Sequence, residues 1–258
     1  MSKKHQFLFN NSKMSILGPT ICVIIFLILW ETTVRGLAVP RYLIPPPSLV
    51  LITIVERFSS LVTDAMVTLI EAVLGFIAGT TAAFLLGALF VRSKLIERSI
   101  SPLFVALQAV PLIAISPLLI IWFGNGLASK VVMAAIACFF PMVINTAAGL
   151  KSVQHESLAL MRVLSATESQ IFWKLRLPTA MPYIFSGLKI SATLSVIGAV
   201  VAELAGATRG IGFQVLMSSY QTDTPMLFAA VIFSALTGIL FFQSIALMEA
   251  RVLKHGRR

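Results

Sequence analysis

The sequence predicts an all-α polytopic membrane protein with six transmembrane helices. Its 258 residues are 58% hydrophobic and only 12% charged, and the mean hydropathy is +0.95. A soluble domain of this length keeps about a quarter of its residues charged. The apolar residues fall into long runs, and the length admits about six spans of roughly 20 residues each plus connections. Basic residues gather in the connections on one side of these spans.

The six spans are expected at residues 15–34, 65–90, 100–123, 129–148, 181–204 and 225–248. The first span follows a basic segment but lacks a small-residue cleavage site, so it is expected to remain as a helix. After it, Pro45, Pro46 and Pro47 cannot continue a helix. Ser48 can then cap an amphipathic segment over 49–61 at the outer surface.

Small residues recur every fourth position along the second span, at Gly75, Gly79, Ala83 and Gly87. This spacing places them on one helix face, where small side chains allow a neighbouring helix to approach closely. The stripe therefore indicates packing between helices.

Three polar side chains inside the spans are candidates for a translocation pathway. Gln108 precedes Pro111 in the third span, Asn145 lies in the fourth, and Glu203 lies near the outer end of the fifth. Prolines in this third span kink the helix and free carbonyls, which membrane proteins tolerate beside a cavity. Gln108 could equally make a structural hydrogen bond, and for Asn145 a hydrogen bond between helices is favoured. Glu203 could equally act at a gate or contact a partner protein at the outer surface.

The distribution of basic residues predicts the topology. Fifteen of the 20 Lys and Arg residues lie on one side of the expected spans. The other side holds Arg35, Arg41, Arg57, Lys130 and Arg209. By the positive-inside rule both termini and the 150–179 loop are cytoplasmic. The net charge of +10 then reflects topology and contact with anionic membrane lipid, and no nucleic-acid partner is expected.

The chain is expected to form one transmembrane domain over 15–250, with cytoplasmic tails over 1–14 and 251–258. Cys22 and Cys138 fall inside expected spans, so a disulfide is not expected. The sequence has no phosphate-binding loop, and its three histidines are far apart. We therefore expect neither catalytic residues nor a metal or other cofactor, and the chain is not expected to be an enzyme.

The 150–179 loop is the only long polar interruption of this apolar chain. Residues 156–164 are mostly good helix formers, and this run of helix-forming residues ends at Ser165. Capping-box patterns starting at Ser165 and at Thr167 predict a second short helix from about Thr167. Leu177-Pro178 is expected to end it, because a residue before proline disfavours the helical region.

Phe172 and Trp173 lie on this second helix. Bulky apolar side chains in a polar loop indicate a docking surface for a soluble partner, where aromatic anchors carry much of the binding energy. Alternatively, both rings pack back onto the bundle or against lipid headgroups.

The loop resembles the EAA loop of bacterial ABC-importer permeases, whose pattern is EAA, three residues, Gly, nine residues, then Ile-x-Leu-Pro. Ala159, Leu160 and Met161 stand at EAA, Ser165 stands at the glycine, and 175–178 read Leu-Arg-Leu-Pro. The spacing fits throughout, although the glutamate, the alanines and the glycine are replaced. Ser165 must make the tight turn without the conformational freedom of glycine.

Other segments resemble the nitrate/sulfonate/taurine-type permeases. They include LIPPPS, QAVPLIAISPLLIIWFGNG, FFPMVINTAAGL and RGIGF. Two more, SVIGAVVAEL and DTPMLFAAVIFSALTGI, look closest to members that carry pyrimidines and vitamin precursors.

The resemblance implies a permease subunit of an ATP-driven importer in the bacterial inner membrane. A second copy would complete a homodimer, a separate ABC ATPase would hydrolyse ATP, and a periplasmic or lipid-anchored binding protein would deliver the solute. The solute would be a sulfonate, taurine, nitrate, or a pyrimidine or riboflavin-type vitamin precursor. The short helix between the fourth and fifth spans would be the cytoplasmic coupling helix. The residues expected to couple to the ATPase are Ser165, Thr167, Glu168, Gln170, Ile171, Phe172, Trp173, Lys174, Leu177 and Pro178.

An ion-coupled secondary transporter is the alternative. It would need ionisable groups near the middle of the membrane, and Glu203 is the best candidate. Glu31, Glu71 and Glu249 lie near expected span ends, which favours interfacial roles. Neither such a carrier nor a channel requires the 150–179 loop, so that loop favours the importer.

Overall fold

The computed structural model describes residues 12–255, which are predominantly helical and contain no strand. Five helices within this range are long and apolar enough to cross a membrane. They are α1 (Ser12–Gly36), α3 (Phe58–Arg92), α6 (Leu127–Lys151), α9 (Leu177–Ala205) and α11 (Thr224–His255). The shorter helices are α2 (Pro47–Glu56), α4 (Lys94–Gln108), α5 (Leu112–Phe123), α7 (His155–Val163), α8 (Glu168–Ile171) and α10 (Ile211–Tyr220). The predicted all-α membrane fold is confirmed.

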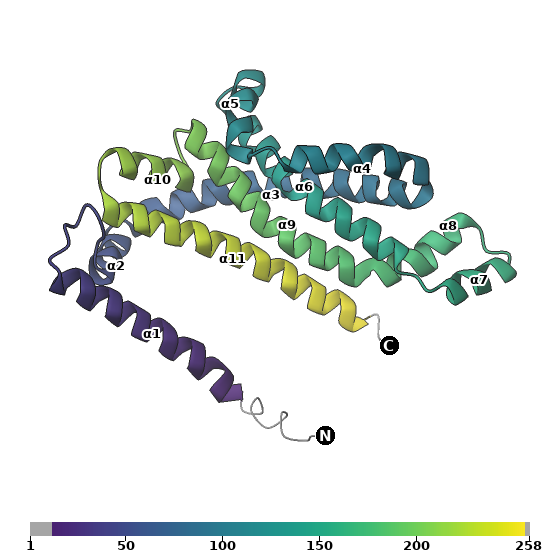
Figure 1. The fold of residues 1–258 in the computed structure, drawn as a ribbon, viewed down its shortest axis with the longest axis horizontal. Helices are drawn as coiled ribbons and strands as arrows, with labels where there is room; N and C mark the ends of the chain where they lie inside the picture. The colour runs from purple at the N-terminus through teal and green to yellow at the C-terminus, as the bar shows by residue number, and fades with distance from the viewer. Residues whose placement is uncertain (1–11, 256–258) are drawn as a thin grey trace.

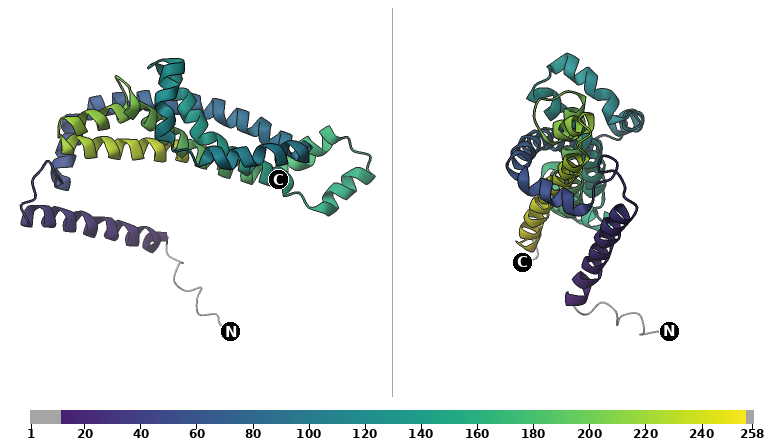
Figure 2. Two further views of the ribbon diagram at one scale, coloured as in Figure 1. Left: turned by 45° about the horizontal axis from the view of Figure 1, so that its top comes forward. Right: turned by 90° about the vertical axis from the view of Figure 1, so that its left-hand side faces the viewer.

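The long helices α3, α6, α9 and α11 form an elongated bundle (Figure 1). One end of the bundle carries α2 and α10 and is called the α10 end below. At the opposite end, the α7 end, α7 and α8 project beyond the bundle. Helix α1 is separated from the bundle helices in both views of Figure 2. Its Trp30 ring contacts the ring of Phe228 on α11, with the two centroids 5.5 Å from each other.

The predicted small-residue stripe is the surface of α3 that packs on α6. All four of its residues are buried. A Cβ atom added to Gly79 would lie 2.6 Å from the backbone oxygen of Ala135 on α6. Side chains larger than hydrogen therefore have no room at this position, and the close approach supplies the van der Waals contact that stabilises helix pairs in lipid.

The expected span over 100–123 is not one continuous helix. Helices α4 and α5 occupy this region and are bent by 99° at the break between them. Pro111 lies at the break and has no N–H to donate, while Val110 precedes a proline and is disfavoured in a helix. Pro102 and Pro117 lie inside α4 and α5 and do not end them.

The connection after α1 differs from the predicted amphipathic helix over 49–61. Helix α2 ends at Glu56, and α3 already begins at Phe58. Ser48 does not cap α2, because Pro46 occupies the N-cap position. The N–H and Oγ of Ser48 instead donate to the carboxylate of Glu31, over 3.0 and 2.8 Å, and so tie α2 to α1.

Candidate functional site

The helix–turn–helix predicted at the α7 end is present. Helix α7 is followed by Ser165, whose φ of 53° lies in the left-handed region that serine rarely adopts. Thr167 then starts α8 with a complete capping box. Its Oγ1 accepts from the Gln170 N–H over 3.3 Å, and the Gln170 Oε1 accepts from the Thr167 N–H over 2.8 Å. Of the two predicted capping boxes, the one starting at Thr167 therefore forms.

The predicted stop at Leu177-Pro178 is wrong. Residues Phe172–Arg176 form one π-helical turn, and the Leu177 N–H donates to the Phe172 carbonyl five residues back. The chain then continues directly into α9 with Pro178 in its first turn. A proline there lacks the N–H for a regular helical bond, and the wider π turn before it accommodates that loss. Helix α8 is thus continuous with a membrane-spanning helix.

The inner face of this segment is fixed to the bundle. Phe172 is 9% exposed and shares an apolar cluster with Phe90 of α3 and Leu150 of α6. The guanidinium carbon of Arg92 lies 5.7 Å from the centre of the Phe172 ring. Arg176 donates to the Leu150 carbonyl over 3.1 Å. Phe172 therefore faces the bundle.

The outer face of the segment is open. Trp173 is 62% exposed, and its ring meets the Phe172 ring edge-on with centroids 5.4 Å apart. On α7, Leu160 and Val163 are 61% and 80% exposed. Among the residues predicted to couple to an ATPase, the side chains that are also exposed are Ser165, Thr167, Glu168, Gln170, Lys174 and Pro178. Leu177 is half-buried, and Ile171 is buried.

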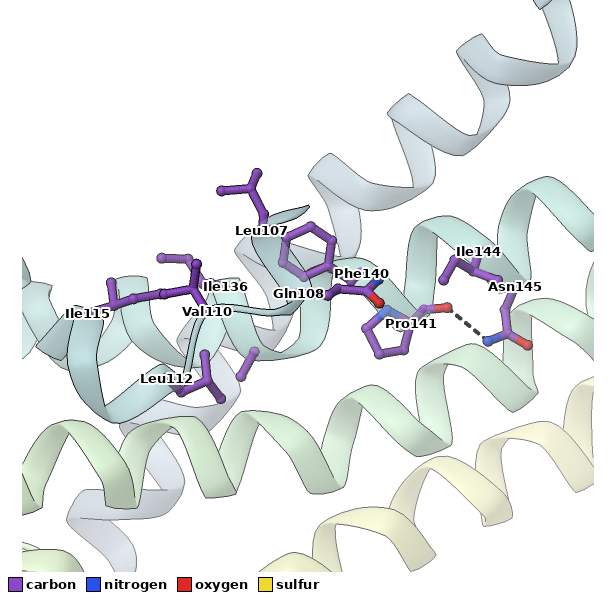
Figure 3. A pocket seen from close by; sticks show the side chains of 11 residues that line it. Leu107, Gln108, Val110, Leu112, Ile115, Ile136, Phe140, Pro141, Ile144 and Asn145 are labelled. Carbon is purple, nitrogen blue, oxygen red and sulfur yellow. Dashed lines mark hydrogen bonds between the residues drawn. The ribbon is translucent and has the colours of Figure 1, made fainter. Parts of the chain in front are cut away.

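Two of the three predicted pathway residues lie in one pocket of about 460 Å³. Gln108 comes from the end of α4 and Asn145 from the C-terminal half of α6 (Figure 3). The Asn145 Nδ2 donates to the Pro141 carbonyl over 2.8 Å. The other lining residues are Leu107, Val110, Leu112, Ile115, Ile136, Ala137, Phe140, Pro141 and Ile144. The pocket thus lies at the break between α4 and α5.

Glu203 does not line this pocket. It is fully buried at the α10 end, where its carboxylate accepts from the Thr68 Oγ1 over 2.7 Å and from the Gly212 N–H over 2.5 Å. Asp64 of α3 accepts from the Gly210 N–H over 3.1 Å. These bonds satisfy backbone donors at the start of α10, which lacks a side-chain cap of its own. Glu203 therefore fixes α10 to α3 and α9.

Sequence reasoning missed the rest of this polar cluster. Glu71, for which an interfacial role was favoured, is only 5% exposed and lies inside the bundle. Lys130 is also buried, and it lies close enough to Glu71 and Glu203 for electrostatic interaction. The sequence did contain one indication of this cluster. Asp64, Thr68 and Glu71 are spaced four and three residues apart and therefore share one face of α3.

Comparison with known proteins finds a family model and several relatives that match this chain. The family described as "Binding-protein-dependent transport system inner membrane component" matches residues 71–254. The formylaminopyrimidine transport permease protein ThiX of Halalkalibacterium halodurans is 34% identical over 90% of this chain and 93% of its own. The putative aliphatic sulfonates transport permease protein SsuC of Bacillus subtilis is 32% identical over 89% of this chain and 84% of its own.

A solved structure shares the fold. A chain of the MetNI methionine ABC transporter in an inward-facing conformation superposes with a TM-score of 0.68 at 17% identity, covering 76% of this chain and 98% of that one. The predicted resemblance is confirmed by the family match and by the two relatives. The chain therefore belongs to the family of binding-protein-dependent transport system inner membrane components, the permease subunits of ABC importers.

Proposed function

We propose that this chain acts as a homodimer in a bacterial inner membrane and couples solute import to a separate ABC ATPase. The ATPase would dock on the segment formed by α7, α8 and the π turn. A periplasmic or lipid-anchored binding protein would deliver the solute at the α10 end. The solute would come from the sulfonate, taurine and nitrate class or from the pyrimidine and riboflavin-type precursors.

The charge distribution supports an orientation with the α7 end in the cytoplasm. Several basic residues lie at or near this end: Arg92, Lys94, Arg98, Lys151, Arg162, Lys174, Arg176 and Arg251. Basic residues close to span ends are retained on the cytoplasmic side. The tails over 1–14 and 251–258 would then both be cytoplasmic and flank one transmembrane domain over 15–250.

The observation that carries the proposal is that the π turn after α8 has one face packed on the bundle and one face exposed. Trp173 faces outward, while its neighbour Phe172 packs against α3 and α6. Because α8 also continues into α9, a force applied to Trp173 by a moving partner passes directly into three membrane-spanning helices. Coupling of this kind needs contiguous packed elements that shift between two arrangements.

The same construction divides the predicted coupling residues into two roles. We infer that Trp173, Lys174 and the exposed residues of α8 contact the ATPase. Ile171 and Phe172 would hold the segment on the bundle instead of touching the partner. The pocket lined by Gln108 and Asn145 would belong to the translocation pathway. Glu203 would instead hold α10 against α3 and α9.

Co-purification with an ATPase tests this proposal, and the chain offers a matched control. Trp173 and Trp122 are 62% and 68% exposed, but Trp122 lies on α5, outside the α7–α8 segment. Removing an interface anchor costs roughly 2 kcal/mol, so Trp173→Ala should weaken ATPase binding about 30-fold. Trp122→Ala should bind as wild type does.

The pull-down uses the tagged chain, solubilised from a cell that expresses its own ATPases, and quantifies the bound ATPase. Monodisperse elution of each variant in size-exclusion chromatography establishes that the bundle is folded. Equal recovery with Trp173→Ala and Trp122→Ala would refute the docking surface. Recovery of no ABC ATPase with the folded wild-type chain would refute the proposed partner.

A further inference from the structure

We propose that a pocket between the end of α1 and the start of α2 binds the phosphate group of an anionic phospholipid such as phosphatidylglycerol. The pocket has a volume of about 370 Å³ and lies at the α10 end, where α1 stops beside α2 (Figure 1). It shares no lining residue with the pocket at the break between α4 and α5. The proposal concerns how the chain is held in its membrane and goes beyond the import function.

Two arginines line this pocket and give it a positive charge. They are Arg35, in the last turn of α1, and Arg41, in the connection to α2. No acidic residue is among the nine residues that line the pocket. A guanidinium group offers five N–H donors in a planar fork, which matches two oxygens of a phosphate group. The pocket therefore suits an anion with several acceptor oxygens.

The network that joins α1 to α2 holds Arg35 in place at the pocket. The Arg35 Nε donates to the Glu31 carboxylate, and its Nη2 donates to the Ser48 Oγ over 3.0 Å. The same carboxylate accepts from the N–H and the Oγ of Ser48. Arg41 differs, because no described residue makes a hydrogen bond or an ion pair with its guanidinium group. Arg41 therefore supplies the unpaired positive charge that a ligand can bind.

The surface around the pocket indicates contact with the bilayer. Arg35 lies in the last turn of α1, a helix long and apolar enough to cross a membrane. On α2, Leu51 and Val55 are 62% and 77% exposed, and Tyr42 in the connection is 59% exposed. Exposed apolar side chains on a short helix and exposed tyrosines are typical of the membrane interface. The pocket therefore lies at a depth where phospholipid phosphates are the most abundant anions.

The apolar side of the pocket favours a phospholipid over a free anion. Val34, Val39 and Leu49 line it together with the arginines, and Val34 is only 6% exposed. The glycerol backbone and the first methylene groups of a lipid can cover these side chains, and removing apolar surface from water is favourable. A free phosphate ion has no apolar part with which to cover them.

The lack of a free carboxylate favours an anionic headgroup over a zwitterionic one. A zwitterionic headgroup carries an ammonium group next to its phosphate, and this cation would lie close to Arg41. No acidic residue lines the pocket to pair with the cation, and Glu31 is already bonded to Arg35 and Ser48. Like charges at close range repel, whereas the headgroup of phosphatidylglycerol adds no positive charge. We therefore expect the site to select anionic lipid.

Native mass spectrometry of the full chain in detergent, titrated with defined lipids, tests the proposal. The probes are phosphatidylglycerol and phosphatidylcholine with identical acyl chains. The wild-type chain should bind phosphatidylglycerol with an apparent Kd at least about fivefold lower than that for phosphatidylcholine. Arg41→Gln should raise the apparent Kd for phosphatidylglycerol about fivefold, the effect of one basic residue at an anionic lipid.

Arg57→Gln is the matched control. Arg57 is also exposed and lies where α2 meets α3, but it does not line the pocket. This variant should bind phosphatidylglycerol as the wild type does. Monodisperse elution of each variant in size-exclusion chromatography establishes that it is folded.

Four results would overturn the proposal. Equal apparent Kd values for the two lipids would remove the selectivity, and wild-type binding by Arg41→Gln would remove the role of that residue. An equal loss in Arg41→Gln and Arg57→Gln would mean that general charge attraction, and not the pocket, holds the lipid. Displacement of bound phosphatidylglycerol by excess inorganic phosphate would show that the site takes a free anion.

Discussion

The close approach of α3 to α6 predicts that one methyl group at Gly79 destabilises the bundle. An added Cβ would lie 2.6 Å from the Ala135 oxygen, whereas ordinary contact begins at 3.4 Å, so the two helices must separate locally by 0.8 Å. The obstructing oxygen is a backbone atom, and a side-chain rotation cannot relieve the clash. Overpacking of this kind costs roughly 1–3 kcal/mol. At about 2–4 °C per kcal/mol, Gly79→Ala should lower Tm by roughly 2–12 °C.

Thermal unfolding in detergent, followed by the fraction of monodisperse protein in size-exclusion chromatography, measures this effect. The control is Gly238→Ala on α11, where an added Cβ meets no atom within 4 Å. Alanine is the better helix former by about 1 kcal/mol, so the control should match or exceed the wild-type Tm.

A second substitution on the same face sharpens the test. A Cβ on Gly75 would lie 2.6 Å from the Val131 oxygen, also on α6. One displacement of α6 relieves both clashes, so the double variant should lose less stability than the sum of the single losses. If Gly79→Ala unfolds at or above the Tm of Gly238→Ala, α3 and α6 do not pack as described.

Three further substitutions test the α7 and α10 ends. Ser165→Gly should raise stability by roughly 0.5–1 kcal/mol, seen as a higher Tm, because glycine adopts the positive φ of 53° without strain. Thr167→Ala should cost about 1 kcal/mol through loss of the capping box, seen as faster amide hydrogen exchange over 168–171. Glu203→Ala should cost roughly 1–3 kcal/mol, because the buried Gly212 N–H loses its acceptor, and exchange in α10 should accelerate.

Each of these predictions has a contrary outcome. A lower Tm for Ser165→Gly would mean that the serine side chain contributes more than its backbone strain costs. If amide hydrogen exchange over 168–171 is the same in Thr167→Ala as in the wild type, contacts with the bundle alone hold α8 in place. Exchange in α10 that does not change in Glu203→Ala would exclude the role of Glu203 in fixing that helix.

The sequence alone determined the fold class, the approximate position of the spans and the helix–turn–helix at the α7 end. These features depend on interactions that are local in the chain. Apolar runs of membrane-spanning length identify the spans, and the Thr167 capping box joins residues only three positions apart. The small-residue stripe was equally visible, because the spacing along one helix fixes its face.

The tertiary structure decided the properties that depend on residues distant in sequence. Phe172 and Trp173 are adjacent and similarly apolar, yet packing against α3 and α6 buries only the first. Glu203 is a pathway candidate by sequence, but its partner Thr68 lies 135 residues away and places it in the polar cluster at the α10 end. A kink in the third span was expected from its prolines, but the size of the bend between α4 and α5, 99°, was not. Local patterns specify which segments enter the membrane, whereas contacts between helices specify which side chains share a site.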